Sequence, residues 1–223
     1  EVAKLNKLAN PNRIRVGQKL EIPLRLLRST EAPTKLVSAS GDVTLAGQPV
    51  TVGQTVPVGA ELKTGANSSA VLELADTSRV QMLPGTLAQV ATSNHYALRD
   101  ASASGSTTWF SGLIRLAQGT LETLAAPAAK LASPLQVQTP TSLVGVRGTQ
   151  FRVAFDDPNG KNARTEVVAG LVRADNPAQG SGADLPKGTG AVVNPAQREV
   201  AVVKLLAAPD VAALADSVSR STG

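Results

Sequence analysis

Short runs of alternating apolar and polar residues, separated by glycine and proline, fill the middle of the chain. Within residues 35–90, Val50 and Val52 alternate with polar neighbours, and Val80 and Met82 do the same. Glycines fall between these runs, mostly six residues apart, at Gly41, Gly47, Gly53, Gly59, Gly65 and Gly85. Alternation with a period of two is typical of half-buried strands, and such closely spaced turns allow only short ones. The segment therefore predicts the rungs of a β-roll or small solenoid, or a Greek-key barrel, between which periodicity does not choose.

Later segments predict further strands. Residues 113–125 predict a hairpin that turns at Gln118-Gly119, and residues 135–176 predict three more strands with a hairpin tip at 156–162, "DDPNGKN". In the strand "QFRVAF" (150–155), the phenylalanines and Val153 are expected to point inward and Arg152 outward. By contrast, residues 91–112 are polar and rich in small side chains, so they are expected to form a loop-like insert.

The two ends of the chain differ from the middle in their pattern of apolar and polar residues. Residues 1–9 place Val2, Leu5 and Leu8 on one helical stripe, "NPNR" (10–13) interrupts it, and a strand is expected to follow. Residues 24–34 are expected to form a linker. Beyond the central domain, residues 176–208 predict a β extension, and residues 209–223 predict a short helix or linker.

Residues 5–23, "LNKLANPNRIRVGQKLEIP", resemble the second half of a LysM domain. LysM is a small βααβ module that binds N-acetylglucosamine polymers such as peptidoglycan. The resemblance rests on Asn6, Leu8, Asn10 and Pro11, followed by "GQKLEIP" (17–23), and it covers about half of the module. It implies that a glycan-binding loop is formed by Asn10, Asn12, Arg13 and Ile14. The alternative is that these residues only end the helix and form a turn.

A second resemblance covers residues 36–175 and concerns the FecR domain of bacterial cell-envelope proteins. It rests on "GDV" (41–43), residues 50–78, "VQMLPGT" (80–86), "TPTSLVGVRGTQFRV" (139–153) and "TEVVAGLVRA" (165–174). The family's usual Asp-Gly-Ser turn is replaced here by Asp76-Thr77-Ser78, which predicts a looser loop. The resemblance implies an interaction or scaffolding domain. The better-known FecR proteins are membrane-spanning regulators that relay an outer-membrane signal to a sigma factor.

Composition narrows the classes of function. Aromatic residues make up 2% of the chain, so the core must consist of valine, leucine and alanine. The absence of cysteine excludes disulfides, thiolate metal sites and cysteine nucleophiles. The net charge is +5, but the basic residues are scattered, which argues against nucleic-acid binding. The sequence contains no run of 18 apolar residues, so no transmembrane segment is predicted. The sequence shows no signal peptide, but we expect this protein to be exported to the periplasm or the cell surface.

The sequence "VGVRGT" (144–149) has glycines at the spacing of a tight loop. It is not a phosphate-binding loop, because no Lys-Ser/Thr pair and no helix follow. Gly145, Arg147 and Gly148 are instead expected to be structural, the glycines allowing a bulge or a close backbone approach and the arginine fixing the corner.

The insert 91–112 contains the residues most suited to ligand contact. Trp109 and Phe110, with Tyr96, either stack on a ligand or partner or pin the insert to the β-stack. His95 is the only histidine and has no catalytic or metal-binding partners at a recognisable spacing.

These observations predict a mainly β, non-enzymatic cell-envelope protein with no cofactor and no metal site. The fold is expected to be a short-stranded FecR-like β-roll or β-sandwich (35–175), preceded by the C-terminal half of a LysM module (1–23). The main interpretation is a peptidoglycan-associated interaction or scaffolding protein. One alternative is a structural or accessory subunit of an envelope machine or surface appendage, whose valine-rich strands would pair between chains. The other is an envelope signal-sensing regulator with a protein partner.

Overall fold

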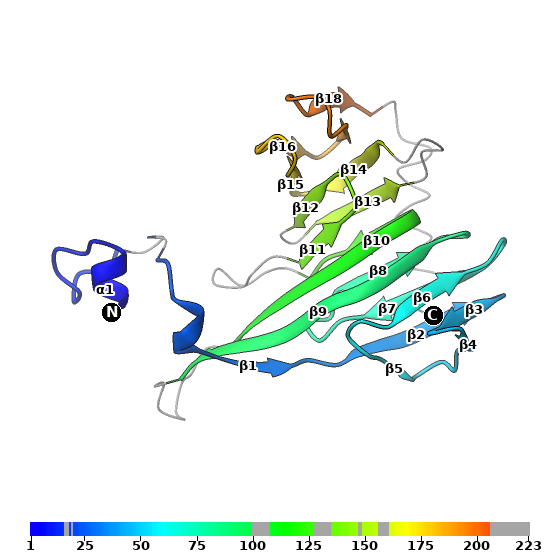
Figure 1. Cartoon of the computed structure of the whole chain (residues 1–223), viewed down its shortest axis with the longest axis horizontal. Coiled ribbons are helices and arrows are strands. Elements are labelled where there is room, and N and C mark those ends of the chain that lie inside the picture. Colours follow the sequence, from blue (N-terminus) through cyan, green and yellow to red (C-terminus); the bar gives the residue numbers. More distant parts are fainter. Residues whose placement is uncertain are drawn as a thin grey trace.

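The computed structural model describes residues 1–15, 18, 20–99, 108–126, 135–146, 149–155 and 161–205. The described part is mainly β, as expected, and its strands form a curled, almost wholly antiparallel arrangement (Figure 1). It consists of two sheets. Sheet A contains β1 (Leu27–Glu31), β3 (Val43–Leu45), β4 (Gln48–Pro49), β6 (Glu61–Thr64), β9 (Leu87–Leu98), the first part of β10 (Trp109–Leu124), β11 (Leu135–Gln138), β12 (Leu143–Val146), β15 (Leu171–Asn176) and β16 (Ser181–Pro186).

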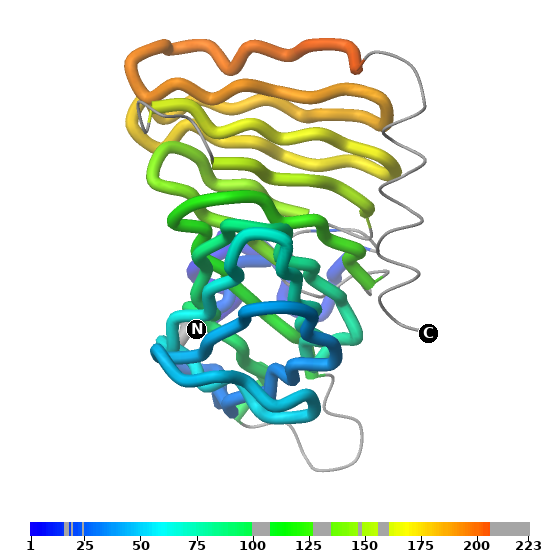
Figure 2. The backbone as a smooth tube through the Cα atoms, turned by 90° about the vertical axis from the view of Figure 1, so that its right-hand side faces the viewer, coloured from blue at the N-terminus to red at the C-terminus, as the bar shows by residue number. Residues whose placement is uncertain are grey.

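Sheet B faces sheet A. It contains β2 (Thr34–Ser40), β5 (Thr55–Val56), β7 (Ser69–Glu73), β8 (Arg79–Met82), the second part of β10, β13 (Gln150–Phe155), β14 (Ala163–Ala169), β17 (Thr189–Val193) and β18 (Ala201–Lys204). The chain alternates between the sheets, so that β11/β12, β13/β14, β15/β16 and β17/β18 add hairpins to A, B, A and B in turn. Figure 2 shows the result as chain segments stacked from β2–β5 at one end to β18 at the other.

One hydrophobic core fills the space between the sheets. It extends from Ala32 and Leu36 at one end of the stack to Ala191 and Val193 at the other, and valine, leucine and alanine supply most of it. Leu185 of β16 belongs to the same core. The strands of the predicted extension, 176–208, therefore continue the FecR-like stack rather than forming a separate unit, because they complete the same sheets over the same core.

The expected inward positions are largely confirmed. Phe151 and Val153 are fully buried and Phe155 is nearly so, as the alternation in β13 predicts. Val80 and Met82 are also fully buried. Val52 is an exception, because it lies in a turn between β4 and β5 and is 55% exposed.

Strand β10 belongs to both sheets. Its first part pairs with β9 and β11 in sheet A, and its second part pairs with β8 and β13 in sheet B. The hairpin predicted at Gln118-Gly119 is therefore wrong. Gly119, at φ +90°, bends the strand from one sheet into the other without reversing it.

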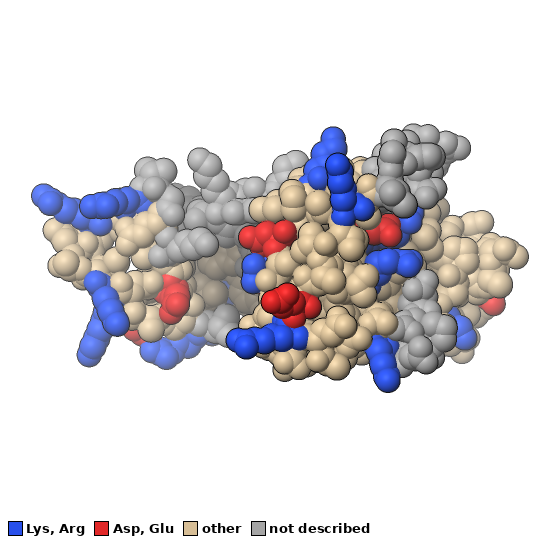
Figure 3. Space-filling view, turned by 90° about the horizontal axis from the view of Figure 1, so that it is seen from above, with Lys and Arg blue, Asp and Glu red and all other residues tan. Residues whose placement is uncertain are grey.

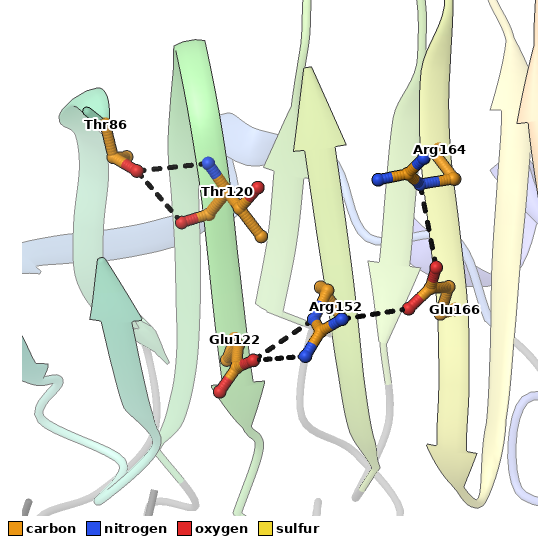
Figure 4. Close-up of polar contacts among 6 residues, drawn as sticks. All are labelled: Thr86, Thr120, Glu122, Arg152, Arg164 and Glu166. Atoms are coloured by element: carbon orange, nitrogen blue, oxygen red, sulfur yellow. Dashed lines mark hydrogen bonds and ion pairs between the residues drawn. The ribbon is translucent and has the colours of Figure 1, made fainter. Parts of the chain in front are cut away.

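Threonine hydroxyls hold this corner together (Figure 4). The Thr86 Oγ1 atom accepts a hydrogen bond from the Thr120 amide at 3.0 Å and donates one to the Thr120 carbonyl at 3.1 Å. The Thr86 amide in turn donates to Thr64 Oγ1 at 3.0 Å. A Cβ on Gly119 would lie 2.6 Å from the Thr86 Cα atom, so the close approach requires glycine. The turn from β8 to β9 is thereby fastened to the crossing in β10.

A row of charged side chains crosses the outer face of sheet B. Arg152 of β13 lies between Glu122 of β10 and Glu166 of β14, which are its direct neighbours in the register. Its guanidinium contacts Glu122 at 2.7 Å and Glu166 at 3.4 Å, and Arg164 contacts Glu166 at 3.6 Å (Figure 4). The Glu122 side chain is only 3% exposed, so Arg152 balances a carboxylate that is shielded from water.

The β7–β8 loop is tight rather than loose as expected. Thr77 adopts φ +69°, the conformation that glycine would take at this position. Its amide donates to the Leu74 carbonyl at 2.9 Å, and both carboxylate oxygens of Asp76 accept hydrogen bonds from Ser78. The two hydrogen bonds that Ser78 donates to the Asp76 side chain compensate for the strained backbone.

The structure does not support a LysM module at the N-terminus. The helix α1 covers only Val2–Leu5, and no described residue from 6 to 23 belongs to a strand. The Asn6 side chain exchanges two hydrogen bonds with the backbone of Glu21, both at 2.7 Å, in the place of a strand pairing. Residues 20–23 have no neighbouring strand among the described residues, and an extended segment without a partner forms no ladder.

The linker expected at 24–34 is also wrong. A 3-10 turn at Leu24–Leu26 leads into β1, which pairs with β9 over five residues from Leu27 to Glu31. The predicted helix or linker at 209–223 lies outside the described residues. So does the hairpin tip at 156–160, although β13 and β14 pair as the two arms of that hairpin.

The corner at Gly119 gives a first testable prediction. Gly119→Ala is expected to lower the free energy of unfolding by roughly 3 to 4 kcal/mol, because it adds a backbone clash to the cost of a positive φ. Gly53 is the matched control, since it has φ +91° and nothing within 4 Å of an added Cβ. Gly53→Ala should cost only about 1 to 2 kcal/mol. Urea unfolding measures both, and equal losses would contradict the role given to the corner.

Candidate functional site

Three strands extend beyond the rest of sheet A as an arm. It consists of β1, the second half of β9 and the first part of β10 (Figure 1). The register places Ser29 beside Tyr96 and Tyr96 beside Trp109, across all three strands. The loop expected at 91–112 is thus mostly strand, and only residues 100–107 between β9 and β10 lie outside the described part.

The inner face of the arm is a continuation of the core. Phe110 is 6% exposed and meets His95 of β9 edge to face, with ring centroids 5.9 Å apart. An added Cβ on Gly112 would lie 2.9 Å from the Phe110 ring and 3.1 Å from Leu74, so the ring covers the glycine. Phe110 is therefore a packing residue, and the prediction that grouped it with the ligand-contacting aromatics is not supported by its position.

The outer face of the arm carries the chain's one tryptophan and one tyrosine. Trp109 and Tyr96 stack with ring centroids 6.3 Å apart and an interplanar angle of 20°. Both side chains are half-buried, and Leu98, on the same face, is 41% exposed. The three phenylalanines, in contrast, are all buried. In a chain so poor in aromatic residues, two on one outward face form the clearest candidate contact surface, because Trp and Tyr are enriched in binding hot spots.

Polar side chains surround the two rings. Ser29 and Glu31 of β1, Asn94 of β9 and Ser111 of β10 lie in the same or the adjacent cross-strand rows. These residues escaped the sequence analysis because the strand pairing was not foreseen. The outer face of β10 continues to Arg115, whose Nε atom donates to Gln138 Oε1 at 3.2 Å beside a pocket of about 320 Å³. The surface thus combines an aromatic centre with a polar rim, and the pocket lies further along β10.

The residues predicted for glycan binding do not form such a surface. Asn10, Asn12, Arg13 and Ile14 are all exposed, and the Asn10 side chain accepts a hydrogen bond from the Asn12 amide at 2.9 Å. This is the turn-forming alternative that the sequence left open. A hollow of about 540 Å³ exists in the N-terminal segment, but none of these four residues lines it. The lining residues are Glu1, Lys4, Leu5, Glu21, Ile22, Pro23 and Arg25.

The glycine-rich corner at 145–148 is described only in part, because Arg147 and Gly148 lie outside the described residues. Gly145 lies in regular register between Gln136 and Arg173, and an added Cβ would meet nothing within 4 Å. Gly145 therefore makes neither a bulge nor a close approach. A register shift does occur further on, between Gln150 and Phe151.

The remaining electrostatic features are local. The hydrogen bonds that Arg173 donates to Asp184, and then to Asp175, raise its pKa on the surface of sheet A. The face seen in Figure 3 carries acidic and basic side chains intermingled. The described residues contain no cluster of three His, Asp or Glu side chains that could hold a metal ion. None of their helices has the length and apolarity needed to cross a bilayer.

Comparison with known proteins identifies the family. The family model "FecR protein" matches residues 60–173, just over half of the 223 residues. The match runs from the residue before β6 to the first half of β15. The chain belongs to the FecR family. FecR proteins are typically associated with the cell envelope. The match includes the arm strands β9 and β10 and the corner at Gly119, so the aromatic centre of the candidate surface lies within the matched residues, whereas β1 lies before them.

Two solved structures are also similar. Both are crystal structures of a "putative anti-sigma factor" from Parabacteroides distasonis ATCC 8503, at 1.65 and 2.50 Å resolution. They are 19% and 18% identical to this chain, with TM-scores of 0.49 and 0.48. The match covers 65% of this chain and 59% of theirs. No curated protein matches this chain.

The different burial of Phe110 and Trp109 gives the second prediction. Phe110→Ala is expected to lower the free energy of unfolding by about 3 kcal/mol, because it empties a packed site over Gly112. Trp109→Ala should cost about 1 kcal/mol or less, since its larger ring is half exposed. Urea unfolding of the two variants checks this. A greater loss for Trp109→Ala would show that the tryptophan pins the arm and that its role is structural.

Proposed function

We propose that this chain is the non-enzymatic, envelope-side sensing domain of a FecR-type regulator. It binds a protein partner through the outer face of the β1–β9–β10 arm, centred on Tyr96 and Trp109. Export to the periplasm is part of the proposal. A regulator of this kind converts partner binding outside the cytoplasm into a change in sigma-factor activity.

The observation that carries the proposal is the position of the two outward-facing, half-buried aromatic residues within a FecR domain. Tyr96 and Trp109 stack on the outward face of strands that lie inside the family match. Aromatic side chains held by a strand pairing are already ordered before binding, so a partner would lose little conformational entropy on contact with them. The half-exposed rings, the exposed Leu98 and the polar rim match the usual composition of a protein interface.

Peptidoglycan association through residues 1–23 remains a prediction that neither the fold nor the family match favours. The exposed turn at Asn10–Arg13 does not line the hollow of the N-terminal segment. A scaffolding role of the stack is compatible with the same family, but no contact among the described residues favours it over sensing.

The third prediction concerns signalling by the full-length protein in its own host. A strain that produces the Tyr96→Ala/Trp109→Ala variant is expected to show the same altered set of sigma-factor-dependent transcripts as a deletion strain. The matched control is Leu171→Ala, which removes a side chain that is 55% exposed at the start of β15, away from the arm. The control strain should match the wild type in RNA sequencing, and immunoblots should show equal protein levels.

Two results would contradict the proposal. One is a deletion that leaves sigma-factor-dependent transcripts unchanged. The other is a double variant that signals like the wild type. A peptidoglycan sedimentation assay tests glycan binding by residues 1–23 separately, provided that the truncated chain begins at Leu24 and so keeps β1. If only the complete chain sediments, residues 1–23 bind glycan after all.

A further inference from the structure

The pocket beside Arg115 lies where β10 leaves sheet A for sheet B. Its volume of about 320 Å³ is within the range of roughly 300 to 1,000 Å³ that is typical of ligand pockets. The described residues that line it belong to β10, to the end of β11 and to the turn after β11. They are Arg115, Leu116, Ala117, Gln138, Thr139 and Pro140. A ligand in this pocket would therefore meet two neighbouring strands at once.

Strand β10 has an open backbone edge beside this pocket. Strands β8 and β9 occupy one side of β10, and β11 and β13 occupy the other. On that second side the pairing with β11 ends at Arg115 opposite Gln138, and the pairing with β13 begins at Gly119. Residues 116–118 therefore face no described strand on the side of the pocket.

The turn after β11 does not close this edge. Pro140 has no N–H group, and the Thr139 amide donates to the Ser142 carbonyl at 2.9 Å. Neither residue can therefore donate a backbone hydrogen bond to β10. The side chain of Leu116 is buried in the core, so the backbone of Leu116 faces the pocket. Its carbonyl is left as an acceptor for a donor from outside.

Arg115 adds a positive charge at the same place. Its Nε atom donates to Gln138 Oε1 at 3.2 Å, which orients the guanidinium plane. Its neighbours across the strands, Gln89 and Gln138, are neutral, and Arg115 forms no ion pair with any residue that the structure describes. The two Nη groups thus present the planar pair of donors that binds a carboxylate through parallel hydrogen bonds.

We propose that this pocket binds the carboxyl-terminal residue of a peptide chain. The terminal carboxylate accepts hydrogen bonds from the Arg115 Nη groups, and the amide of the terminal residue donates to the Leu116 carbonyl. The Ala117 side chain and the Pro140 ring provide apolar contacts for the terminal side chain. Capture of a carboxyl terminus by a cation and backbone groups is a recurring mode of peptide recognition.

The end of a chain fits this edge better than a passing strand. The open edge is three residues long, with β11 before it and β13 after it. A longer segment would collide with one of these strands, whereas a terminal residue needs only one backbone acceptor and the guanidinium. Both are present within two consecutive residues of β10.

The proposal does not depend on the aromatic surface of the arm. Arg115 follows Trp109 by six residues along β10, a distance of about 20 Å. Neither Tyr96 nor Trp109 lines the pocket. The Tyr96→Ala/Trp109→Ala variant should therefore bind a peptide in the pocket like the wild type, so that either proposal can fail without the other.

The fourth prediction is tested by NMR titration of the isotope-labelled chain with acetyl-Ala-Ala-Ala at constant ionic strength. The amide resonances of Ala117 and Gln138 and the Arg115 Nε–H resonance should shift, with a dissociation constant on the order of 1 mM. The same tripeptide with an amidated carboxyl terminus should bind at least about tenfold more weakly, because it lacks the carboxylate. Succinate has carboxylates but no peptide N–H, and it should also bind more weakly than the tripeptide.

Variants of the pocket test the assigned residue. Arg115→Gln should weaken binding of the tripeptide at least about tenfold, and Arg115→Lys, which keeps the charge but not the planar fork, should weaken it about threefold or more. Arg198→Gln is the matched control, since it removes an exposed arginine outside the pocket, and it should bind like the wild type.

Four results would overturn the proposal. The first is the absence of shifts up to about 20 mM tripeptide, well above the expected constant. The second is equal binding of the acid and the amidated tripeptide. The third is unchanged binding by Arg115→Gln. The fourth is succinate binding as tightly as the tripeptide, because the pocket would then recognise a carboxylate alone and not a peptide terminus.

Discussion

The passage of β10 between the two sheets is the constraint on which the rest of the structure depends. The strand runs without interruption from Trp109 to Leu124, yet its first part pairs in sheet A and its second part in sheet B. Every other described strand is placed outward from it, on one side or the other. The passage requires a residue without a Cβ at Gly119 and a hydroxyl at Thr86 that satisfies both backbone groups of Thr120. A small local geometry thereby fixes how the two layers enclose the core.

The same strand connects the core to the candidate binding surface. Its inward residues, from Phe110 to Leu121, pack between the sheets, while Trp109 at its start lies on the outer face of the arm. A core of valine, leucine and alanine needs few aromatic residues, so the chain's tryptophan and tyrosine are not needed inside. Their outward position, on strands whose other face is buried, combines exposure with rigidity. That combination favours partner binding as the role of the arm in a FecR-family protein.

The local sequence pattern predicted the features that depend on residues close together in the chain. The alternation in β13 placed Phe151 and Val153 in the core, and turn glycines such as Gly41 and Gly59 do adopt positive φ. The FecR resemblance was also visible in short motifs. The expected hairpin at Gln118-Gly119 failed because a glycine after a polar residue serves a turn and a corner equally well. The choice is made by Thr86, more than 30 residues away.

The candidate site was harder to foresee for the same reason. Residues 91–98 are polar on both faces, and only pairing with β1 and β10 makes them a strand. Residues 27–31 carry Arg28 and Glu31 and precede Pro33, so their pattern is that of a linker until β9 supplies a partner. The LysM resemblance failed in the opposite way, because matching residues were present without a neighbouring strand to pair with. Tyr96 and Trp109 were identified as contact residues, but Phe110 could be separated from them only by its burial.

Native-state hydrogen exchange of β10 tests most directly whether one strand unites the two sheets. If β10 is shared, amides in its sheet A part, such as Ile114, and in its sheet B part, such as Leu121, should exchange only through global unfolding. Both should then report the same free energy, equal to that from urea unfolding. If the two parts exchange with clearly different free energies, the sheets open independently, and the corner at Gly119 does not hold the fold together.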